Sequence, residues 1–358
     1  MIQTEKIINA WLSKKSPRSV GINEISEFDI TVATSIGNVR NENQDRAIVV
    51  RFTPAENSNG SFLFAAVCDG LGGMTDGGKC AEIALSSIIP HLISNKVGLL
   101  SRSSSAIKHA NSKIFEKYHG NGGTTLTAIF IDSSGASLGA NVGDSRLYTI
   151  SKSDVFKQIS VDDNIAEQIK EIKGESASID NSYLRGSQLT QFIGIGEDLE
   201  TRIIPVTDSS SDLSLLLTSD GIHTLDQKLM SEIVTNAPSS IETVKRLLHV
   251  SLWAGGKDNA SAIYIPPVPL SKWKKDNPDN LDMLEIWDGY GKTEVLLPAV
   301  NESNISKKRS WSKGYKPKPK SKSKKKKKNK LSDTDTTKKS IKEIKNQLKL
   351  DDIVKDSD

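Results

Sequence analysis

The sequence is poor in cysteine and histidine, with two and five residues respectively, and it has no long apolar run. Two cysteines, Cys68 and Cys80, are too few for a disulfide framework, and both lie in apolar surroundings, so we expect reduced packing residues. No two histidines form a ligand-like pair, which argues against a zinc site. No segment approaches the roughly 18 apolar residues of a membrane helix, and the first residues do not resemble a secretory signal. We therefore expect a cytoplasmic protein that is not transmembrane.

Only 36% of the residues are hydrophobic, and this shortage is local. Residues 301–358 hold 20 Lys and Arg against 8 Asp and Glu, a net charge of +12, whereas residues 1–265 hold 24 against 30, a net charge of −6. The run KPKPKSKSKKKKKNK in this tail is of low complexity and cannot bury a core, so it should be disordered. Within the tail, residues 338–354 have the apolar spacing of a short helix. The pattern indicates an acidic globular body with a Lys-rich tail.

The body contains short segments rich in β-branched and aromatic residues and broken by Gly, Asn and Pro, which predict strands. These segments are residues 28–37, 45–52, 61–68, 124–131, 136–143, 145–150, 213–219 and 260–266. Helical spacing of apolar residues is found at 83–93, 107–115, 226–236 and 241–253. Clustered strands with paired helices favour an α+β fold with antiparallel sheets over alternating βαβ units. The polar residues 151–190 predict an insertion of loop and short helix.

The same patterns suggest four parts of the chain. Residues 1–27 are a loose N-terminal arm, 28–266 the globular domain, 267–300 a linker, and 301–358 the Lys-rich low-complexity tail. An apolar island at 281–300 is either a docking segment for a partner or a last piece of packing against the core.

The stretch FAAVCDGLGGMTDGG, residues 64–78, places a carboxylate where a buried strand reaches the surface. The same arrangement recurs, with aspartates at the ends of other predicted strands. The five residues are Asp45, Asp69, Asp144, Asp220 and Asp258. Each alone is also ordinary turn chemistry. Together they are the pattern of a site for Mg²⁺ or Mn²⁺, which prefer oxygen ligands on rigid supports.

Six motifs around these aspartates occur in an order that resembles the type 2C metal-dependent protein serine/threonine phosphatases (PPM family). They are GNVRNENQDR (37–46), VCDGLGG (67–73), GGTTLTAIFI (122–131), GANVGDSRLY (139–148), LLTSDGI (216–222) and GGKDNASAIYI (255–265). The resemblance covers about residues 28–266. It implies an α+β fold in which two antiparallel sheets form a sandwich flanked by helix pairs (αββα).

The resemblance also implies a set of metal ligands. In chain order they are Asp45, Asp69, Gly70, Asp144, Asp220 and Asp258. Asp69 would bridge two Mn²⁺ or Mg²⁺ ions, one of which also binds the Gly70 carbonyl oxygen. Asp220 and Asp258 would complete the shell of the first ion, and Asp45 would act through water near the second.

Two further roles follow from the resemblance. Arg40 would hold the substrate phosphate, for which a planar guanidinium is suited, and with Asp69 it is an implied catalytic residue. Asp144 and Asp220 would hold the third, looser ion of bacterial-type members. A water activated between two ions would attack a phosphoserine or phosphothreonine directly, so the reaction needs no cysteine nucleophile.

Two departures point to the bacterial type. Gln44 stands where the family often has an acid, which predicts a weaker second metal site. Leu71 replaces the histidine of eukaryotic members, so the leaving-group proton would come from a metal-bound water. The insertion at 151–190 lies where the family has a flap, and it matches only loosely. We interpret His223 as packed under a strand end and not as an acid.

The partners expected from the sequence are a phosphorylated protein and a cognate serine/threonine kinase. The Lys-rich tail could also bind an acidic protein, nucleic acid or an anionic membrane, because such attraction depends on charge alone. One alternative is a catalytically dead module that binds phosphoproteins or scaffolds a complex, although such a module has no need of three intact metal ligands. A second alternative makes the tail primary, with the phosphatase domain serving a nucleic-acid or scaffold assembly.

Overall fold

The strands and helices lie in one part of the chain. The computed structural model describes residues 2–14, 20–55, 60–95, 97–151, 155–173, 188–206, 213–267 and 281–297. The chain divides into Met1–Asn301 and Glu302–Asp358. The second unit, with the predicted tail and its short helix, lies outside the described residues.

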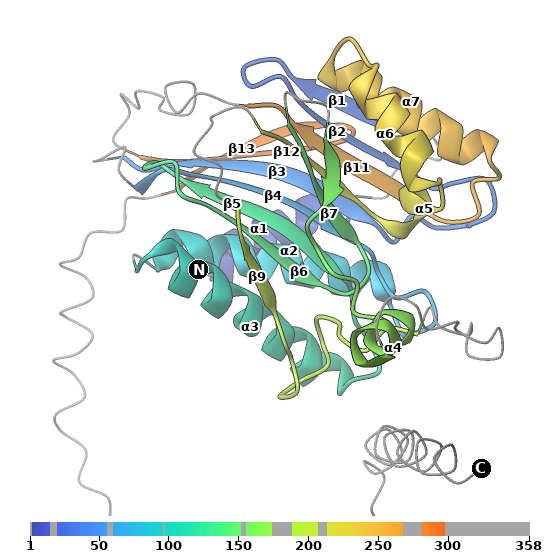
Figure 1. Cartoon of the computed structure of the whole chain (residues 1–358). Coiled ribbons are helices and arrows are strands. Elements are labelled where there is room, and N and C mark those ends of the chain that lie inside the picture. Colours follow the sequence, from blue (N-terminus) through green and yellow to red (C-terminus); the bar gives the residue numbers. More distant parts are fainter. Residues whose placement is uncertain are drawn as a thin grey trace, which may run out of the picture. The chain divides into compact units, whose positions relative to one another are not determined.

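Two antiparallel sheets form the centre of the first unit (Figure 1). The six-stranded sheet has the order β1 (Gly21–Ile25), β2 (Ile30–Ser35), β11 (Ala260–Ile265), β10 (Ser214–Thr218), β7 (Arg146–Ile150) and β8 (Phe156–Gln158). The seven-stranded sheet has the order β13 (Gly291–Leu297), β12 (Asp282–Asp288), β3 (Arg46–Thr53), β4 (Phe62–Cys68), β5 (Leu126–Asp132), β6 (Ser137–Val142) and β9 (Arg202–Pro205). The predicted antiparallel α+β class is confirmed.

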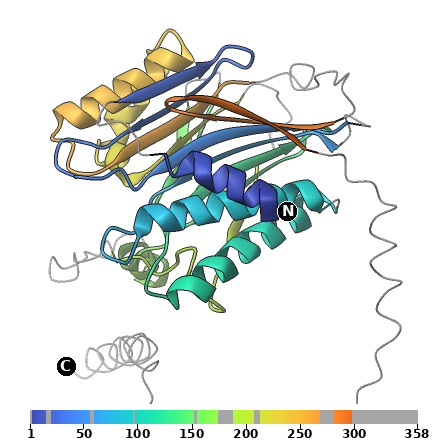
Figure 2. The same cartoon turned by 180° about the vertical axis from the view of Figure 1, so that it is seen from behind.

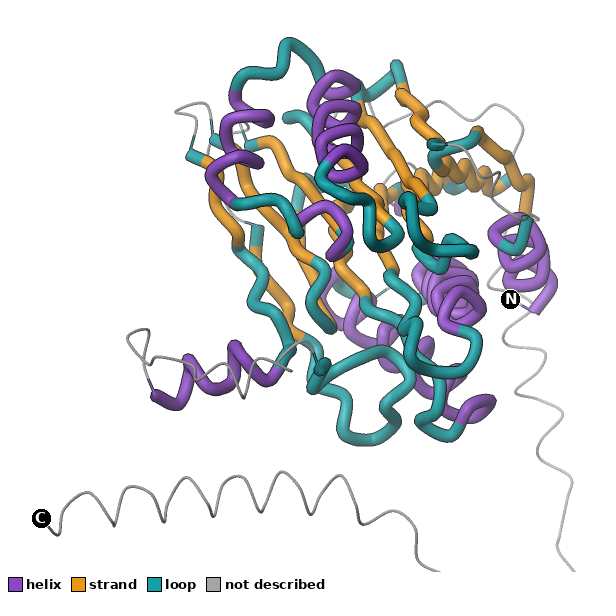
Figure 3. Tube along the Cα trace, turned by 90° about the vertical axis from the view of Figure 1, so that its right-hand side faces the viewer, coloured by secondary structure: helices purple, strands orange, loops and turns teal. Residues whose placement is uncertain are grey.

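Helices cover the outer faces of both sheets (Figures 1 and 2). Those on the seven-stranded sheet are α1 (Ile2–Leu12), α2 (Gly77–Ser94) and α3 (Leu99–Tyr118), and those on the six-stranded sheet are α5 (Asp220–His223), α6 (Gln227–Thr235) and α7 (Ser240–Trp253). The helix α4 (Ile165–Lys173) lies in the predicted insertion. The αββα sandwich implied by the resemblance is therefore confirmed, and Figure 3 shows the connecting loops in teal at the strand ends.

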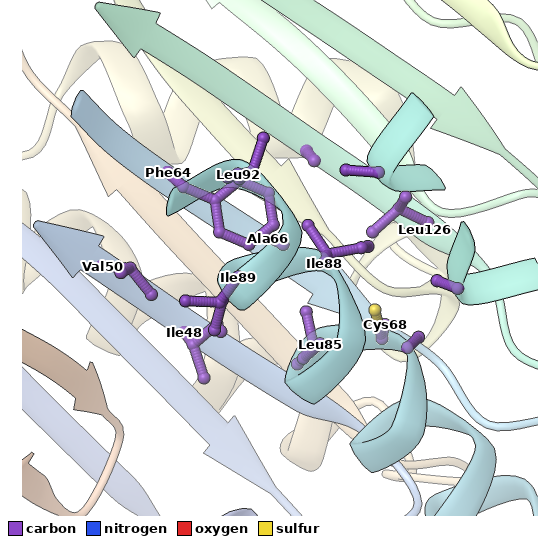
Figure 4. Close-up of a cluster of buried hydrophobic side chains, with 14 of the residues drawn as sticks. Ile48, Val50, Phe64, Ala66, Cys68, Leu85, Ile88, Ile89, Leu92 and Leu126 are labelled. Atoms are coloured by element: carbon purple, nitrogen blue, oxygen red, sulfur yellow. The ribbon is translucent and has the colours of Figure 1, made fainter. Parts of the chain in front are cut away.

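The core has three layers, one for each contact between these sheets and helices. Ile88 and Ile89 of α2 pack on Ile48 and Phe64 of the seven-stranded sheet (Figure 4). A second layer lies between the two sheets, and a third lies between the six-stranded sheet and the helices α6 and α7. The segments β3 and β4 are almost wholly buried because both of their faces are covered. This explains why β4 is a continuous apolar run rather than an alternating one.

The prediction of a loose arm at 1–27 is wrong for most of these residues. Residues 2–12 form α1, and its Ile8 and Leu12 are buried in the layer against α2. Gly21–Ile25 is the edge strand β1, paired with β2. The sequence pattern failed here because α1 presents only a narrow apolar face, on which two residues are fully buried.

The predicted linker at 267–300 also contains structure. Residues 282–297 form the hairpin β12–β13, which extends the seven-stranded sheet beside β3. The apolar island is thus a piece of packing, the second of its two predicted roles. Residues 268–280 and 298–300 lie outside the described residues.

A buried ion pair fastens this hairpin to β3. Arg51 and Glu285 are cross-strand partners, and the Arg51 Nε donates to Glu285 Oε2 at 2.5 Å. Lys292 of β13 lies 2.7 Å from the other oxygen of Glu285, and the Arg51 guanidinium also packs over the ring of Phe28 at 4.9 Å. Both side chains of the pair are almost inaccessible to solvent. Such a pair is costly to break, because loss of Glu285 leaves the buried Arg51 with only the half-exposed Glu27, at 2.8 Å, as a counter-charge.

No helix among the described residues is long and apolar enough to cross a membrane.

We expect Glu285→Gln to lower the free energy of unfolding by about 3 kcal/mol or more, because Arg51 loses its buried counter-charge. The exposed Glu294, which also contacts Lys292, provides the matched control, and Glu294→Gln should cost less than about 1 kcal/mol. Urea denaturation of both variants measures the difference. Equal midpoints would contradict a stabilising role for the pair.

The effect should also depend on pH. Burial by itself would raise the pKa of Glu285, but hydrogen bonds from Arg51 and Lys292 outweigh it and the pKa is lowered. A lowered pKa in the folded state adds stability above the unfolded pKa of about 4.3, and this stability is lost as the pH falls through the folded pKa. The difference between wild type and Glu285→Gln should therefore shrink below about pH 4.

Candidate functional site

Strand register brings the predicted aspartates to one end of the sandwich. In the seven-stranded sheet Arg46 pairs with Cys68, so Asp45 and Asp69, one residue beyond each, face each other. In the six-stranded sheet Arg146 pairs with Thr218, so Asp144 and Asp220, two residues beyond each, extend toward the same place. The loop before β11 carries Asp258. The predicted residues, separated by up to 213 positions, therefore meet at one end.

The electrostatics of these groups confirm that they lie close together. Asp69 is half-buried, and its pKa is raised well above the ordinary value by burial and then by repulsion from Asp45, Asp220, Asp144 and Asp258. Burial also raises the pKa of Asp45 to about 7, with Asp220 and Asp258 adding to the effect and hydrogen bonds from Ser219 and Ser261 opposing it. The pKa of Asp144 is raised to about 7 by burial and by Asp220. Each carboxylate is destabilised by the others.

The arrangement has the oxygen donors that a hard divalent cation requires. Asp45 Oδ1 and Asp220 Oδ1 are buried and accept no hydrogen bond in the described part of the chain. Such orphaned carboxylate oxygens are costly unless a cation or water satisfies them. Over the described ranges, no three His, Cys, Asp or Glu side chains are drawn together into a closed metal cage. The residues fit the ions in their chemistry.

Arg40 lies beside this group. Its Nη2 donates to Asp258 Oδ2 at 2.5 Å, and the hydrogen bond to Asp258 raises the pKa of the guanidinium, with smaller contributions from Asp220 and Asp69. The Arg40 side chain is 45% exposed. A guanidinium beside clustered carboxylates can exchange its carboxylate partner for a phosphate, since both groups accept two parallel hydrogen bonds from it.

Two glycines of the segment 70–78, Gly70 and Gly77, are required by close backbone packing. A Cβ at Gly70 would lie 2.3 Å from the Gly77 carbonyl carbon, and a Cβ at Gly77 would lie 2.7 Å from that of Gly70. The backbone of Gly70 also bridges to Thr124, whose hydroxyl donates to the Asp69 carbonyl oxygen at 2.9 Å. The loop is thereby folded back on itself directly after β4, which fixes Asp69 and the Gly70 carbonyl at the strand end.

Sequence reasoning missed the residues that hold the aspartates. Ser219 Oγ donates to Asp45 Oδ2 at 2.7 Å and so links the two sheets. Asn259 Oδ1 accepts from Gln44 N at 2.8 Å, while its Nδ2 donates to the carbonyls of Ile36 and Glu42 at 2.9 Å. Both residues stand next to a predicted aspartate in the sequence, which is the only signal that pointed to them.

Arg46 was also missed, and it connects the site to the N-terminal helix. Its guanidinium donates to the carbonyls of Asn43 and Asp45 at 2.9 and 2.7 Å, to the Leu12 carbonyl at the end of α1 at 3.1 Å, and to Glu82 of α2 at 2.6 Å. One side chain thus braces the loop that carries Asp45 against two helices.

Three other predictions concern residues near the site. Leu71 N donates to the Gly123 carbonyl at 3.1 Å, so Leu71 belongs to the folded-back loop. His223 is half-buried, and its pKa is lowered well below the ordinary value by burial and then by Arg146, in keeping with a packed residue. Of the predicted flap at 151–190, residues 174–187 lie outside the described residues.

A cavity of about 300 Å³ lies behind Asp45, between α1 and the hairpin β12–β13. Its walls include Trp11, Thr34, Arg46 and Tyr290, and Asp45 is the only one of the five clustered aspartates that lines it. We place the chemistry at the aspartates because they gather charge of one sign, whereas the charged residues lining this cavity are of both signs.

Comparison with known proteins agrees with this geometry. No protein-family model matches the chain. It is 27% identical over 209 residues to the serine/threonine protein phosphatase PstP of Mycobacterium tuberculosis, a match that covers 55% of this chain and 39% of that protein. The chain thus spans well under half the length of this curated relative.

Solved structures are similar over more of their length. The PPM Ser-Thr phosphatase MsPP of Mycobacterium smegmatis, solved in complex with cacodylate, is 27% identical, with a TM-score of 0.55 over 66% of this chain and 97% of that one. Stp1 of Staphylococcus aureus shares the fold at 18% identity, with a TM-score of 0.56 over 70% of this chain and 98% of that one. The catalytic domain of PstP, solved with two manganese ions, has a TM-score of 0.53 at 21% identity, over 69% of this chain and 99% of that domain. The resemblance to bacterial PPM-type phosphatases, predicted from six motifs, is confirmed.

The mutual repulsion of the aspartates yields a test that needs no substrate. In EDTA at pH 8, Asp69→Asn should raise the melting temperature, because it removes a buried negative charge from among four others. A domain of this size gains about 2–4 °C for each kcal/mol. Differential scanning fluorimetry, with Mn²⁺ then added, should show wild type stabilised by the ion and the variant stabilised less. A lower melting temperature for Asp69→Asn in EDTA would show that the carboxylate is satisfied without a cation.

Proposed function

We propose that this protein is a metal-dependent protein serine/threonine phosphatase of bacterial type, which hydrolyses phosphoserine and phosphothreonine in protein substrates. The observation that carries the proposal is the convergence of five aspartates from the ends of strands in both sheets, with an exposed arginine beside them. The likeness to MsPP over nearly the whole of that protein supports the same activity.

The aspartates are suited to hold two Mg²⁺ or Mn²⁺ ions. Asp69 would be a ligand of both ions and the Gly70 carbonyl a ligand of one of them. Asp220 and Asp258 would hold the first ion, and Asp45 would act on the second through water. Asp144 and Asp220 are the ligands we assign to a third, looser ion. The manganese ions in the PstP catalytic domain, which has the same fold, support this choice of metal. When bound, such ions lower the pKa of a shared water and so supply a hydroxide nucleophile at neutral pH.

The chain's own residues would position the substrate. Arg40 can leave Asp258 and donate two parallel N–H bonds to phosphate oxygens, which aligns the phosphorus and meets the negative charge that develops there. Ser219 keeps Asp45 in one orientation, and Arg46 fixes its backbone. Gln44 adds no charge beside Asp45, so we expect the second ion to bind more weakly than in relatives with an acid there.

A catalytically dead module is not favoured, since the three carboxylates Asp69, Asp220 and Asp258 are all present. We also propose that the substrate is a protein phosphorylated by a cognate serine/threonine kinase. The proposed location of the enzyme is the cytoplasm. The Lys-rich tail at 301–358 would hold the enzyme near an acidic protein, a nucleic acid or an anionic membrane by charge.

The first measurement is hydrolysis of a small aryl phosphate and a phosphothreonine peptide, with and without Mn²⁺. Wild type should turn over both only with the metal. Asp220→Asn should lose at least about a hundredfold in kcat, since a ligand of the ion that activates the nucleophile is weakened. Asp198→Asn, at an exposed loop position, is the matched control and should act like wild type. No turnover by wild type at any Mn²⁺ concentration would sink the proposal.

Arg40 should affect substrate binding more than metal binding. We expect Arg40→Met to raise KM for the phosphopeptide by about tenfold or more, because a charge-assisted hydrogen bond to phosphate is lost. Arg40→Lys should restore part of the loss, since a point charge remains without the fork. A Mn²⁺ titration by scanning fluorimetry provides the control and should stay close to wild type. An unchanged KM in Arg40→Met would remove the residue from the phosphate site.

A further inference from the structure

The most exposed large apolar side chain in the described part of the chain stands at the rim of the candidate site. Trp253, the last residue of α7, is 89% exposed. The opposite face of α7 is buried through Val244, Leu247 and Leu248, so Trp253 contributes little to the core. A single exposed apolar residue is ordinary on a protein surface. Its position relative to Arg40 distinguishes this one.

Hydrogen bonds join the end of α7 to the loop that carries Arg40. The side-chain amide of Asn38 donates to the carbonyls of Leu252 and Gly255 at 2.8 and 3.2 Å. The backbone N of Asn38 donates to the Gly256 carbonyl at 2.7 Å. Trp253 and Asn38 therefore lie on neighbouring segments that are fixed to each other.

The two segments approach too closely for ordinary side chains, so the junction is also rigid. A Cβ at Gly37 would lie 2.2 Å from the Asp258 carbonyl oxygen, and one at Gly256 would lie 2.7 Å from the Asn38 amide. Both glycines have positive φ angles, +79° and +55°. Arg40 is bound to Asp258 on the same loop pair. The geometry fixes Trp253 and Arg40 on one continuous edge.

A second exposed apolar residue lies on this edge. Val39, directly before Arg40, is 64% exposed. The exposed Lys257 follows the end of α7, and its side chain runs beside Gly255. The edge thus presents two apolar side chains and two cations. Such a surface is complementary to a segment in which a phosphorylated residue stands next to an apolar residue. An exposed tryptophan is the residue type most often found as an anchor in binding surfaces.

We propose that Trp253 and Val39 form a docking edge for an apolar side chain of the phosphoprotein substrate, close to its phosphorylated residue. This inference rests on the proposed function and names the substrate class more narrowly. The phosphate would bind Arg40 while the neighbouring apolar residue packs on the Trp253 ring. The contact would lower KM for segments that carry such a residue and would leave isolated phosphate esters unaffected.

The test compares three kinds of substrate in the full chain with Mn²⁺. They are p-nitrophenyl phosphate, a phosphothreonine peptide with serine and glycine at all flanking positions, and a series in which one leucine is moved along those positions. Wild type should prefer at least one leucine peptide over the leucine-free peptide by about tenfold in kcat/KM, the gain from one well-packed apolar anchor. Trp253→Ala should abolish this preference through KM and leave p-nitrophenyl phosphate within about twofold of wild type.

Two further variants separate docking from general damage. Trp253→Phe should retain most of the preference, because a flat apolar ring remains. Leu100→Ala removes another exposed apolar side chain, 56% accessible, from α3 on the other sheet, and should change nothing. Equal losses on peptides and p-nitrophenyl phosphate in Trp253→Ala would show a structural effect and overturn the inference.

The outcomes also separate this inference from the proposed function. If wild type hydrolyses none of the substrates, the proposed function itself has failed. If it hydrolyses p-nitrophenyl phosphate but treats all peptides alike, only the docking edge is overturned. A chain ending at residue 300 gives the last comparison. If removing 301–358 lowers KM for the leucine peptides, and Trp253→Ala in the full chain lowers it as well instead of raising it, the edge binds the chain's own tail and the substrate assignment is wrong.

Discussion

Five carboxylates held together at one end of the sandwich are the constraint on which the rest of the structure depends. Antiparallel pairing places Asp45 opposite Asp69 and Asp144 near Asp220, and burial then raises the pKa of each group. A cluster of this kind opposes folding, since like charges repel most strongly where water is excluded. The remainder of the fold must supply enough stability to keep them there, and a cation of the right size would relieve the repulsion.

The site is held by neutral groups as well as by charges. Ser219, Asn259 and Thr125 bind the backbone or the carboxylates with hydroxyl and amide groups. These groups fix orientation without adding a positive charge inside the cluster, so the carboxylates remain available to an ion. The cations stay at the margin, with Arg40 at the mouth and Arg46 behind Asp45. This separation suits a site in which the clustered carboxylates are left for metal ions and the arginine at the margin is left for a phosphate.

The sequence alone could predict much of the fold and the position of the aspartates. Continuous apolar runs such as 62–68 are unambiguous strands, and an aspartate directly after such a run must lie at the strand end. The helix α1 was not predicted as part of the core, and for the segment of the hairpin β12–β13 core packing was only one of two predicted roles. The burial of both depends on contacts with α2 and β3, far away in the chain. Arg46 could not be assigned either, since its four acceptors come from three separate segments. Local patterns report which face is apolar, but not which distant backbone carbonyl needs a donor.

Arg46 also shows how the added elements bear on the site. The carbonyl of Leu12 terminates α1 and is satisfied by the same guanidinium that holds Asn43 and Asp45. Glu82 balances the charge of Arg46 and also accepts hydrogen bonds from Ser13 and Lys79. Displacing α1 would therefore remove one acceptor of Arg46, the side chain that positions the proposed metal-site residue Asp45. The N-terminal helix and the loop of Asp45 are parts of one hydrogen-bonded network, so the elements that sequence patterns assigned to a loose arm contribute to the shape of the site.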